Sequence, residues 1–276
     1  MNVLMAVLLV AAAGENDATP TPPASAQVPL PEATAPAAKS QPPEVYKVRL
    51  AVDIPIIVAG GAAGLARVLF KDKLVQKSCP CDSASINRLD RWTVGYHSQA
   101  ASVAADVTVY GVLLALPFVD LLDLGFGRAL GEDVVVYVEA IAVSTAIQNA
   151  TNFIVARPRP RSYAGDPAMA NSGEGYLSFY AGHVSTVSAG LVVVALTIRK
   201  RYGEQVWPWI VAALITSSVA VERVASGHHF PTDVAVAAVA GTAVGFAVPW
   251  LHFRSGKTYA QIAPVGANGL GLVGAF

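Results

Sequence analysis

One arginine, one histidine and one aspartate stand at spacings of six and four between two very apolar stretches, at Arg223, His229 and Asp233. Ionisable side chains beside lipid are costly unless they face a polar site. A carboxylate four residues after a histidine, where a helix begins, can hydrogen-bond the imidazole and so fix which ring nitrogen stays free. The free nitrogen can then act as a nucleophile, and the arginine can bind the anion that it attacks. The same residues also fit a loop whose polar side chains face lipid head groups.

A second group of such residues lies upstream. Arg157, Arg159 and Arg161 crowd a segment stiffened by two prolines, which holds their heads apart, although positive flanks of a membrane helix would look similar. Gly182 and His183 come directly before an apolar run. A glycine at a helix start lets backbone N–H groups approach an anion, which the helix dipole also favours. Together the two groups indicate phosphoryl transfer by a nucleophile and a general acid, with no metal ion or other cofactor.

These blocks resemble the motifs of the type 2 phosphatidic acid phosphatase superfamily, which also includes vanadium haloperoxidases and bacterial acid phosphatases. Its pattern is Lys-x6-Arg-Pro, then Pro-Ser-Gly-His, then Ser-Arg-x5-His-x3-Asp. Arg159-Pro160 matches the end of the first block, Gly182-His183 matches the end of the second, and the third is matched at full spacing. The resemblance covers roughly residues 85–253. It implies an all-α, polytopic membrane helical bundle with an acid phosphatase/vanadium haloperoxidase-like core.

The resemblance also implies a role for each matched residue. His229 would be the nucleophile that forms a phosphohistidine, oriented by Asp233, and His183 would protonate the leaving group. The phosphoryl oxygens would be held by the other motif positions, namely Arg159, Arg223 and the backbone N–H of Gly182. The implied activity is metal-independent hydrolysis of a phosphomonoester or diphosphate on a lipid. Phosphatidic acid, phosphatidylglycerophosphate and prenyl diphosphates are all candidate substrates.

Four positions depart from the family pattern, and one of them is Tyr180, in place of the proline of the second block. Asn152 stands where the family has its phosphate-binding lysine, Ala181 replaces the serine of the second block, and Glu222 replaces the serine before the arginine of the third. Losing one cation from such a clamp would cost about 2–4 kcal/mol, by analogy with deleting an oxyanion-hole donor. Asn152 stays a candidate substrate-binding residue, and Arg157 could compensate in part for the missing charge. We expect a working or weakened enzyme.

Two further functions remain open at this point. One is a catalytically weakened or inactive lipid-phosphate-binding protein, motivated by Asn152, Ala181 and Glu222. The other is a vanadate-dependent oxidase, which is disfavoured because that chemistry also relies on the missing lysine and usually occurs in soluble helical proteins.

The composition agrees with a membrane protein. Of 276 residues, 54% are hydrophobic and 14% charged, whereas soluble domains average about 25% charged. The formal net charge of zero argues against nucleic acid as a partner. We expect about six transmembrane helices, because apolar segments cover 53–70, 100–119, 134–155, 180–198, 207–221 and 234–253, and about 20 residues span a bilayer. The alternative is a soluble protein with an unusually apolar helical core.

The ends of the chain differ from the middle. Residues 1–14 resemble a signal peptide without its basic start, and residues 15–45 form a Pro/Ala-rich stretch that predicts a disordered linker. Residues 46–254 are the expected phosphatase-like domain, followed by an extended tail over 255–276. Cys79 and Cys81 are the only cysteines, and one intervening residue disfavours a disulfide between them.

The expected sidedness depends on basic residues. Arg199, Lys200 and Arg201 lie between the fourth and fifth apolar segments, on the side opposite both motif groups. The positive-inside rule places these three residues in the cytoplasm, and hence the site in the periplasm of a bacterial inner membrane. A cleaved signal followed by six spans would place the site on the other side, and we favour the first arrangement.

Overall fold

The structure is a computed structural model, and it describes residues 43–79, 81–254, 259–264 and 270–275. The expected signal-peptide-like segment and most of the expected linker lie outside these residues. Val45 is buried, and its carbonyl accepts a hydrogen bond of 3.1 Å from the Arg254 backbone N–H. The folded region therefore includes the end of the range 15–45 that the sequence predicts to be a linker.

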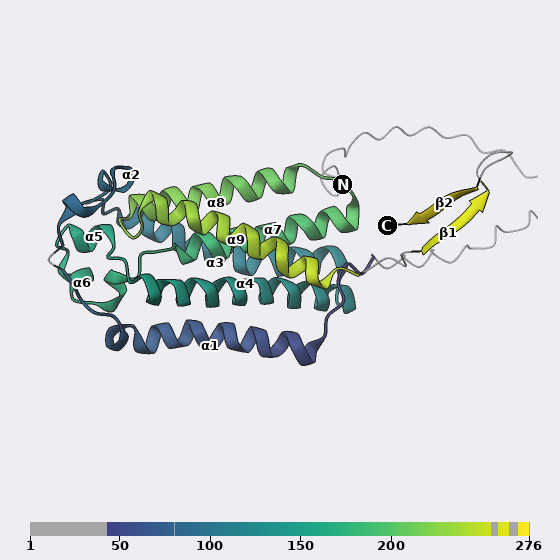
Figure 1. Ribbon diagram of the computed structural model, residues 1–276, viewed down its shortest axis with the longest axis horizontal. Coiled ribbons are helices and arrows are strands. Elements are labelled where there is room, and N and C mark those ends of the chain that lie inside the picture. Colours follow the sequence, from purple (N-terminus) through teal and green to yellow (C-terminus); the bar gives the residue numbers. More distant parts are fainter. Residues whose placement is uncertain (1–42, 80, 255–258, 265–269, 276) are drawn as a thin grey trace, which may run out of the picture. The chain divides into compact units, whose positions relative to one another are not determined.

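Six long helices occupy the six apolar segments (Figure 1). They are α1 (Leu50–Leu74), α3 (Gln99–Leu124), α4 (Arg128–Val155), α7 (Gly182–Tyr202), α8 (Trp207–Ala225) and α9 (Pro231–His252). Most extend beyond the apolar run, because polar residues at the ends still adopt helical geometry. The chain is a helical membrane bundle, as the sequence predicted.

Five of these helices, all except α4, are long and apolar enough to cross a membrane by length and composition. The exception has a polar side that faces the protein interior rather than lipid. Its buried polar residues are Glu132, Asp133, Glu139, Ser144, Gln148, Asn149 and Asn152. Such residues lower the hydropathy of a helix without exposing charge to lipid, because neighbouring helices cover them.

Helix α7 lies at the centre of the bundle, in contact with α3, α4, α8 and α9, while α1 packs along α4. Small residues allow the close approaches. A Cβ atom on Gly241 of α9 would lie 2.2 Å from the Ser185 carbonyl oxygen of α7, and one on Gly60 of α1 would lie 2.5 Å from the Ala142 carbonyl oxygen of α4. These contacts fix how the helices that carry the motif residues sit against one another.

Short helical elements connect the long ones. They are η1 (Ser83–Ser85), α2 (Arg88–Arg91), α5 (Pro160–Tyr163), α6 (Pro167–Ala170) and η2 (Gly173–Tyr176). Contacts of α2 with α9 and of η2 with α1 place this connecting layer at the end of the bundle where α1 and α4 finish and α7 and α9 begin. Both motif groups lie at that end.

The structure also bears on the predictions for the C-terminal tail and for the two cysteines. The tail contains two antiparallel strands, β1 (Tyr259–Pro264) and β2 (Leu270–Ala275), paired from Tyr259 with Ala275 to Pro264 with Leu270. Cys79 and Cys81 form a disulfide, contrary to the expectation from their spacing.

Candidate active site

A cavity of about 470 Å³ opens where α1, α3, α4, α7 and α8 meet the connecting layer. Its ionisable lining comprises the side chains of Arg67, Arg159, Glu174, His183, Arg223 and His229, and Gly182 contributes backbone. All motif residues with a proposed direct role therefore face one space, except Asn152. Three arginines against one glutamate leave the lining with an excess of positive charge, which suits a phosphate group.

His229 lies in the turn between α8 and α9, and its side chain is buried. Its Nδ1 is 2.7 Å from the Ser178 carbonyl oxygen. A carbonyl can only accept, so Nδ1 must carry the ring proton and Nε2 keeps its lone pair. Burial, with the positive charges of Arg159 and Arg223, lowers the pKa of His229 well below its usual value. The imidazole is thus neutral, as a nucleophile must be.

Asp233 does not make the direct hydrogen bond to His229 that its spacing predicts. Its Oδ2 lies 3.9 Å from His229 Nδ1 and instead accepts hydrogen bonds from Ser178 Oγ at 2.5 Å and from the Phe230 backbone N–H at 2.9 Å. The carboxylate therefore holds the residue whose carbonyl orients the imidazole. The orientation is indirect because the Ser178 main chain lies against the ring.

Arg157 is also placed differently from our expectation. Its guanidinium donates to Asp233 Oδ1 at 2.5 Å and to Asp90 Oδ2 at 2.7 Å, and it stacks 4.2 Å from the centre of the Phe230 ring. These contacts tie α2 to the start of α9. The side chain is committed to this structural network and does not line the cavity.

His183 is the second residue of α7, and its Nε2 lies 2.8 Å from Oδ1 of Asp106 on α3. The carboxylate accepts, so this contact keeps a proton on the ring nitrogen that faces it. Arg223 Nη1 is 3.3 Å from the same oxygen. Asp106 is a site residue that the sequence analysis missed, because a single aspartate inside an apolar segment carries no motif.

Arg159 is buried at the wall of the cavity and is held by Glu174. Its Nε donates to the Glu174 carbonyl at 2.8 Å, and its Nη2 donates to the Glu174 carboxylate. Arg67 and Lys71 of α1 also pair with that carboxylate, at 2.7 and 3.4 Å. The surrounding cations lower the pKa of Glu174 to about 2 against the opposing effect of burial. The glutamate therefore stays ionised and holds the basic side chains together.

Asn152 is fully buried and does not line the cavity. Its amide nitrogen donates to the carbonyls of Phe179 and Tyr180 at 2.6 and 3.1 Å, and its Oδ1 accepts from Arg67 Nη1. Arg67 itself does line the cavity. Position 152 therefore has no cation, but Arg67 of α1 hydrogen-bonds to Asn152 and brings a positive charge to the cavity. Nothing in the sequence marks Arg67, because its place depends on how α1 packs against α4.

The start of α7 completes the site. Gly182 is its first residue, and a Cβ there would lie 3.1 Å from the Gln148 carboxamide carbon. The first N–H groups of a helix have no partner within it and favour an anion. Ala181 precedes this turn without a side-chain cap, so the serine replaced there leaves only backbone donors.

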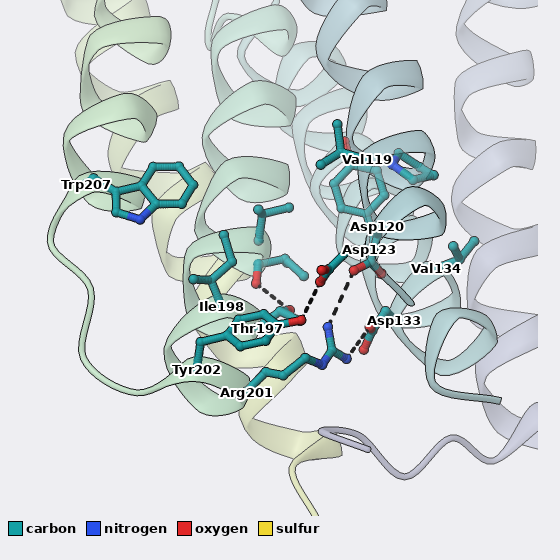
Figure 2. A pocket seen from close by; sticks show the side chains of 14 residues that line it. Val119, Asp120, Asp123, Asp133, Val134, Thr197, Ile198, Arg201, Tyr202 and Trp207 are labelled. Carbon is teal, nitrogen blue, oxygen red and sulfur yellow. Dashed lines mark hydrogen bonds and ion pairs between the residues drawn. The ribbon is translucent and has the colours of Figure 1, made fainter. Parts of the chain in front are cut away.

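A second cavity, of about 300 Å³, lies at the other end of the bundle and contains none of the motif residues. Figure 2 shows Arg201 reaching Asp133 and Asp120, at 2.5 and 3.4 Å, while the Tyr202 hydroxyl donates to Asp123. Its charged groups already pair with one another. We therefore assign the chemistry to the first cavity.

Comparisons with known proteins give one family match and two similar solved structures. Residues 133–257 match the family model of the PAP2 superfamily, and this range includes every motif residue but neither Arg67 nor Asp106. No curated protein matches. The crystal structure of Aquifex aeolicus LpxE is similar with 22% identity and a TM-score of 0.41, covering 57% of this chain and 90% of that one. A Bacillus subtilis PAP2-type phosphatidylglycerolphosphate phosphatase has 17% identity, a TM-score of 0.46, and coverage of 72% and 94%.

Proposed function

Because residues 133–257 match the family model of the PAP2 superfamily, we propose that the chain hydrolyses the phosphomonoester or diphosphate of a membrane lipid through a phosphohistidine. The observation that carries the proposal is the state of His229. Its Nδ1 proton is committed to a carbonyl, and its ring borders a cavity with three arginines. A neutral imidazole with a free nitrogen beside an anion site is suited to nucleophilic attack on phosphorus.

The proposed reaction has two steps. His229 Nε2 attacks phosphorus, the bond from phosphorus to the lipid oxygen breaks, and the protonated ring of His183 gives one of its two N–H protons to that oxygen and becomes neutral. His183 then takes a proton from water, which attacks the phosphohistidine and releases phosphate and free His229. Asp106 supports the first step because its carboxylate, 2.8 Å from His183 Nε2, stabilises the protonated ring.

The phosphoryl oxygens are held by Arg67, Arg159 and Arg223, together with the backbone N–H groups at the start of α7. Charge that develops on these oxygens is stabilised by donors fixed beforehand. Glu174 fixes two of the arginines, since its carboxylate accepts from both Arg67 and Arg159. In this proposal Asn152 positions Arg67 and does not touch the substrate.

The apolar side of the cavity supports a lipid substrate. Val109, Tyr110 and Leu113 of α3 line it, and an exposed apolar stripe runs along the same helix through Val103, Val107, Tyr110 and Leu114. Spacings of four, three and four place the stripe on one face. We propose that the acyl or prenyl chain lies along this face while the phosphate enters the cavity from the membrane surface.

We further propose that the site faces the periplasm of a bacterial inner membrane. The cytoplasmic assignment of the opposite end rests on Arg199 and Lys200. Arg201 does not count toward it, because this residue is buried and pairs with Asp133. Arg199 pairs with exposed Glu204 at 2.7 Å and can face solvent.

The test is release of inorganic phosphate by purified protein in detergent from phosphatidic acid, phosphatidylglycerophosphate and a prenyl diphosphate. We expect turnover of at least one, unchanged in initial rate by EDTA, and none in His229→Ala. Binding of these lipids without turnover by the wild type would favour the inactive binding protein instead. Asp106 and Glu174 support that alternative, because their carboxylates contact Arg223 and Arg159 and compete with phosphate for these arginines.

A further inference from the structure

Three buried ionisable side chains from three helices meet near the end of the bundle opposite the active site. Asp53 lies near the start of α1, Glu139 in α4 and His252 at the end of α9, with exposed fractions of 3, 4 and 9%. One candidate ligand atom from each lies within 4.8 Å of the other two. Glu139 precedes Asn152 by 13 residues of one helix, or roughly 20 Å at 1.5 Å per residue, so this cluster is separate from the catalytic cavity.

The tautomer of His252 leaves one ring nitrogen free to bind a metal ion. His252 Nδ1 is 2.8 Å from the Val248 carbonyl oxygen, which requires the ring proton to be on Nδ1. The other nitrogen, Nε2, then carries a lone pair directed at the two carboxylates. Metal-binding histidines commonly have this arrangement, with the remote nitrogen donating to a backbone carbonyl.

The contacts between that nitrogen and the two carboxylates are long. His252 Nε2 is 3.4 Å from Asp53 Oδ1 and 3.3 Å from Glu139 Oε2, whereas N–H···O bonds are usually 2.7–3.2 Å. A metal ion about 2.0–2.2 Å from each of three ligands would hold those ligands roughly 3–3.6 Å apart. The two separations from His252 Nε2 fall in that range.

Glu139 Oε2 supplies an independent observation. It is buried without a hydrogen-bond partner among the described residues, and it points at His252 Nε2. A buried, unpaired carboxylate oxygen is costly. Two carboxylates around a neutral imidazole carry two negative charges, which a divalent cation would neutralise.

We propose that Asp53, Glu139 and His252 bind a zinc ion that fastens α1 and α9 to α4. One imidazole nitrogen and two carboxylate oxygens form a donor set that zinc accepts. The site has a structural role: it stabilises the packing of α1 and α9 on α4 and takes no part in the reaction. This cluster could not be predicted from a sequence motif, because its members lie 86 and 113 residues apart along the chain.

The experiment measures zinc bound by the full chain, purified in detergent with any affinity tag removed. The protein is stripped with chelator, loaded with zinc, desalted and analysed by elemental mass spectrometry, and its melting temperature is recorded with and without the ion. We expect about one zinc per chain in the wild type and a higher melting temperature with zinc. Glu139→Gln, which keeps the side-chain shape, should retain less than about a tenth of that zinc.

Glu132→Gln is the matched control, since Glu132 lies two turns earlier on α4 and pairs with Arg128 and Arg254. It should bind zinc like the wild type. If Glu139→Gln does not fold, as judged by gel filtration, Asp53→Asn replaces it. Absence of zinc from the loaded wild type would overturn the proposal, and so would equal zinc in the wild type and a folded ligand variant. His252 would then be protonated and paired with the carboxylates of Asp53 and Glu139.

Discussion

At the scale of single residues, Arg67 is the most important addition to the site predicted from the motifs. It contacts Asn152 and Glu174 and lines the cavity with Arg159 and Arg223. The motif spacing predicted that both histidines and two of the arginines would gather, because short motifs fix residues relative to a helix end. The same spacing could not reveal Arg67 or Asp106, since both enter through contacts between helices far apart in the sequence.

Removing Arg67 should weaken catalysis strongly. Arg67→Ala deletes a charged donor and should lower kcat/KM about 100-fold, or roughly 2.7 kcal/mol of transition-state stabilisation. Lys73→Ala, an exposed lysine in the last turn of the same helix, is the control and should leave kcat/KM unchanged. The measurement is phosphate release at several lipid concentrations.

Asn152→Lys then tests whether the two cations exchange roles. Alone, the lysine should lower kcat/KM, because its ammonium would lie beside the Arg67 guanidinium. Combined with Arg67→Ala, it should recover part of the lost rate. This differs from the expectation from sequence alone, in which the lysine simply adds a missing charge. An increase from Asn152→Lys in the presence of Arg67 would contradict the assignment.

The pH profile reports on His229. Its pKa lies well below 6.5, and the reaction requires the deprotonated ring, so the rate should rise with pH along a limb displaced below pH 6.5. At pH 6.5 and above the ring is already neutral. The falling limb should come from loss of the His183 proton and disappear in His183→Ala assayed with an activated leaving group. A rising limb centred at or above pH 6.5 in kcat/KM would show that His229 is not held neutral.

At the scale of elements, the six apolar segments predicted six helices correctly, because hydrophobic length is a strong local signal. The packing of α1 on α4 could not be predicted, since it depends on small residues meeting across the interface. Asp233 illustrates the same limit. Its spacing from His229 indicated a hydrogen bond, but the Ser178 carbonyl, supplied by a connecting segment, takes that position.

Two adjacent glycines of α1 test this packing. A Cβ on Gly60 would lie 2.5 Å from the Ala142 carbonyl oxygen, whereas one on Gly61 would have no atom within 4 Å. Gly60→Ala should lower the melting temperature and, by displacing Arg67, the catalytic rate. Gly61→Ala should leave activity unchanged and raise stability by about 0.5–1 kcal/mol through helix propensity. Equal effects of the two changes on the melting temperature and on activity would contradict the described packing.

At the scale of the whole molecule, alternation of helix direction brings both motif groups to one end, and Arg199 with Lys200 lies at the other. This arrangement gives the proposed sidedness a direct test at the Cys79–Cys81 disulfide, which precedes α3 at the active-site end. After reduction with a reductant that does not cross the membrane, an impermeant thiol reagent should label the chain in intact spheroplasts. Labelling only after permeabilisation would place the site in the cytoplasm.

The central claim is that His229 forms a covalent bond to phosphorus, and the most direct measurement is capture of that intermediate. Purified protein is mixed with a lipid carrying a radiolabelled phosphate, quenched in alkali within milliseconds to seconds, and assayed for label on the chain. The account predicts an acid-labile, alkali-stable phosphoenzyme that is absent from His229→Ala and retained by Lys73→Ala. Turnover by His229→Ala at the wild-type rate, or label of the same lability on that variant, would contradict it.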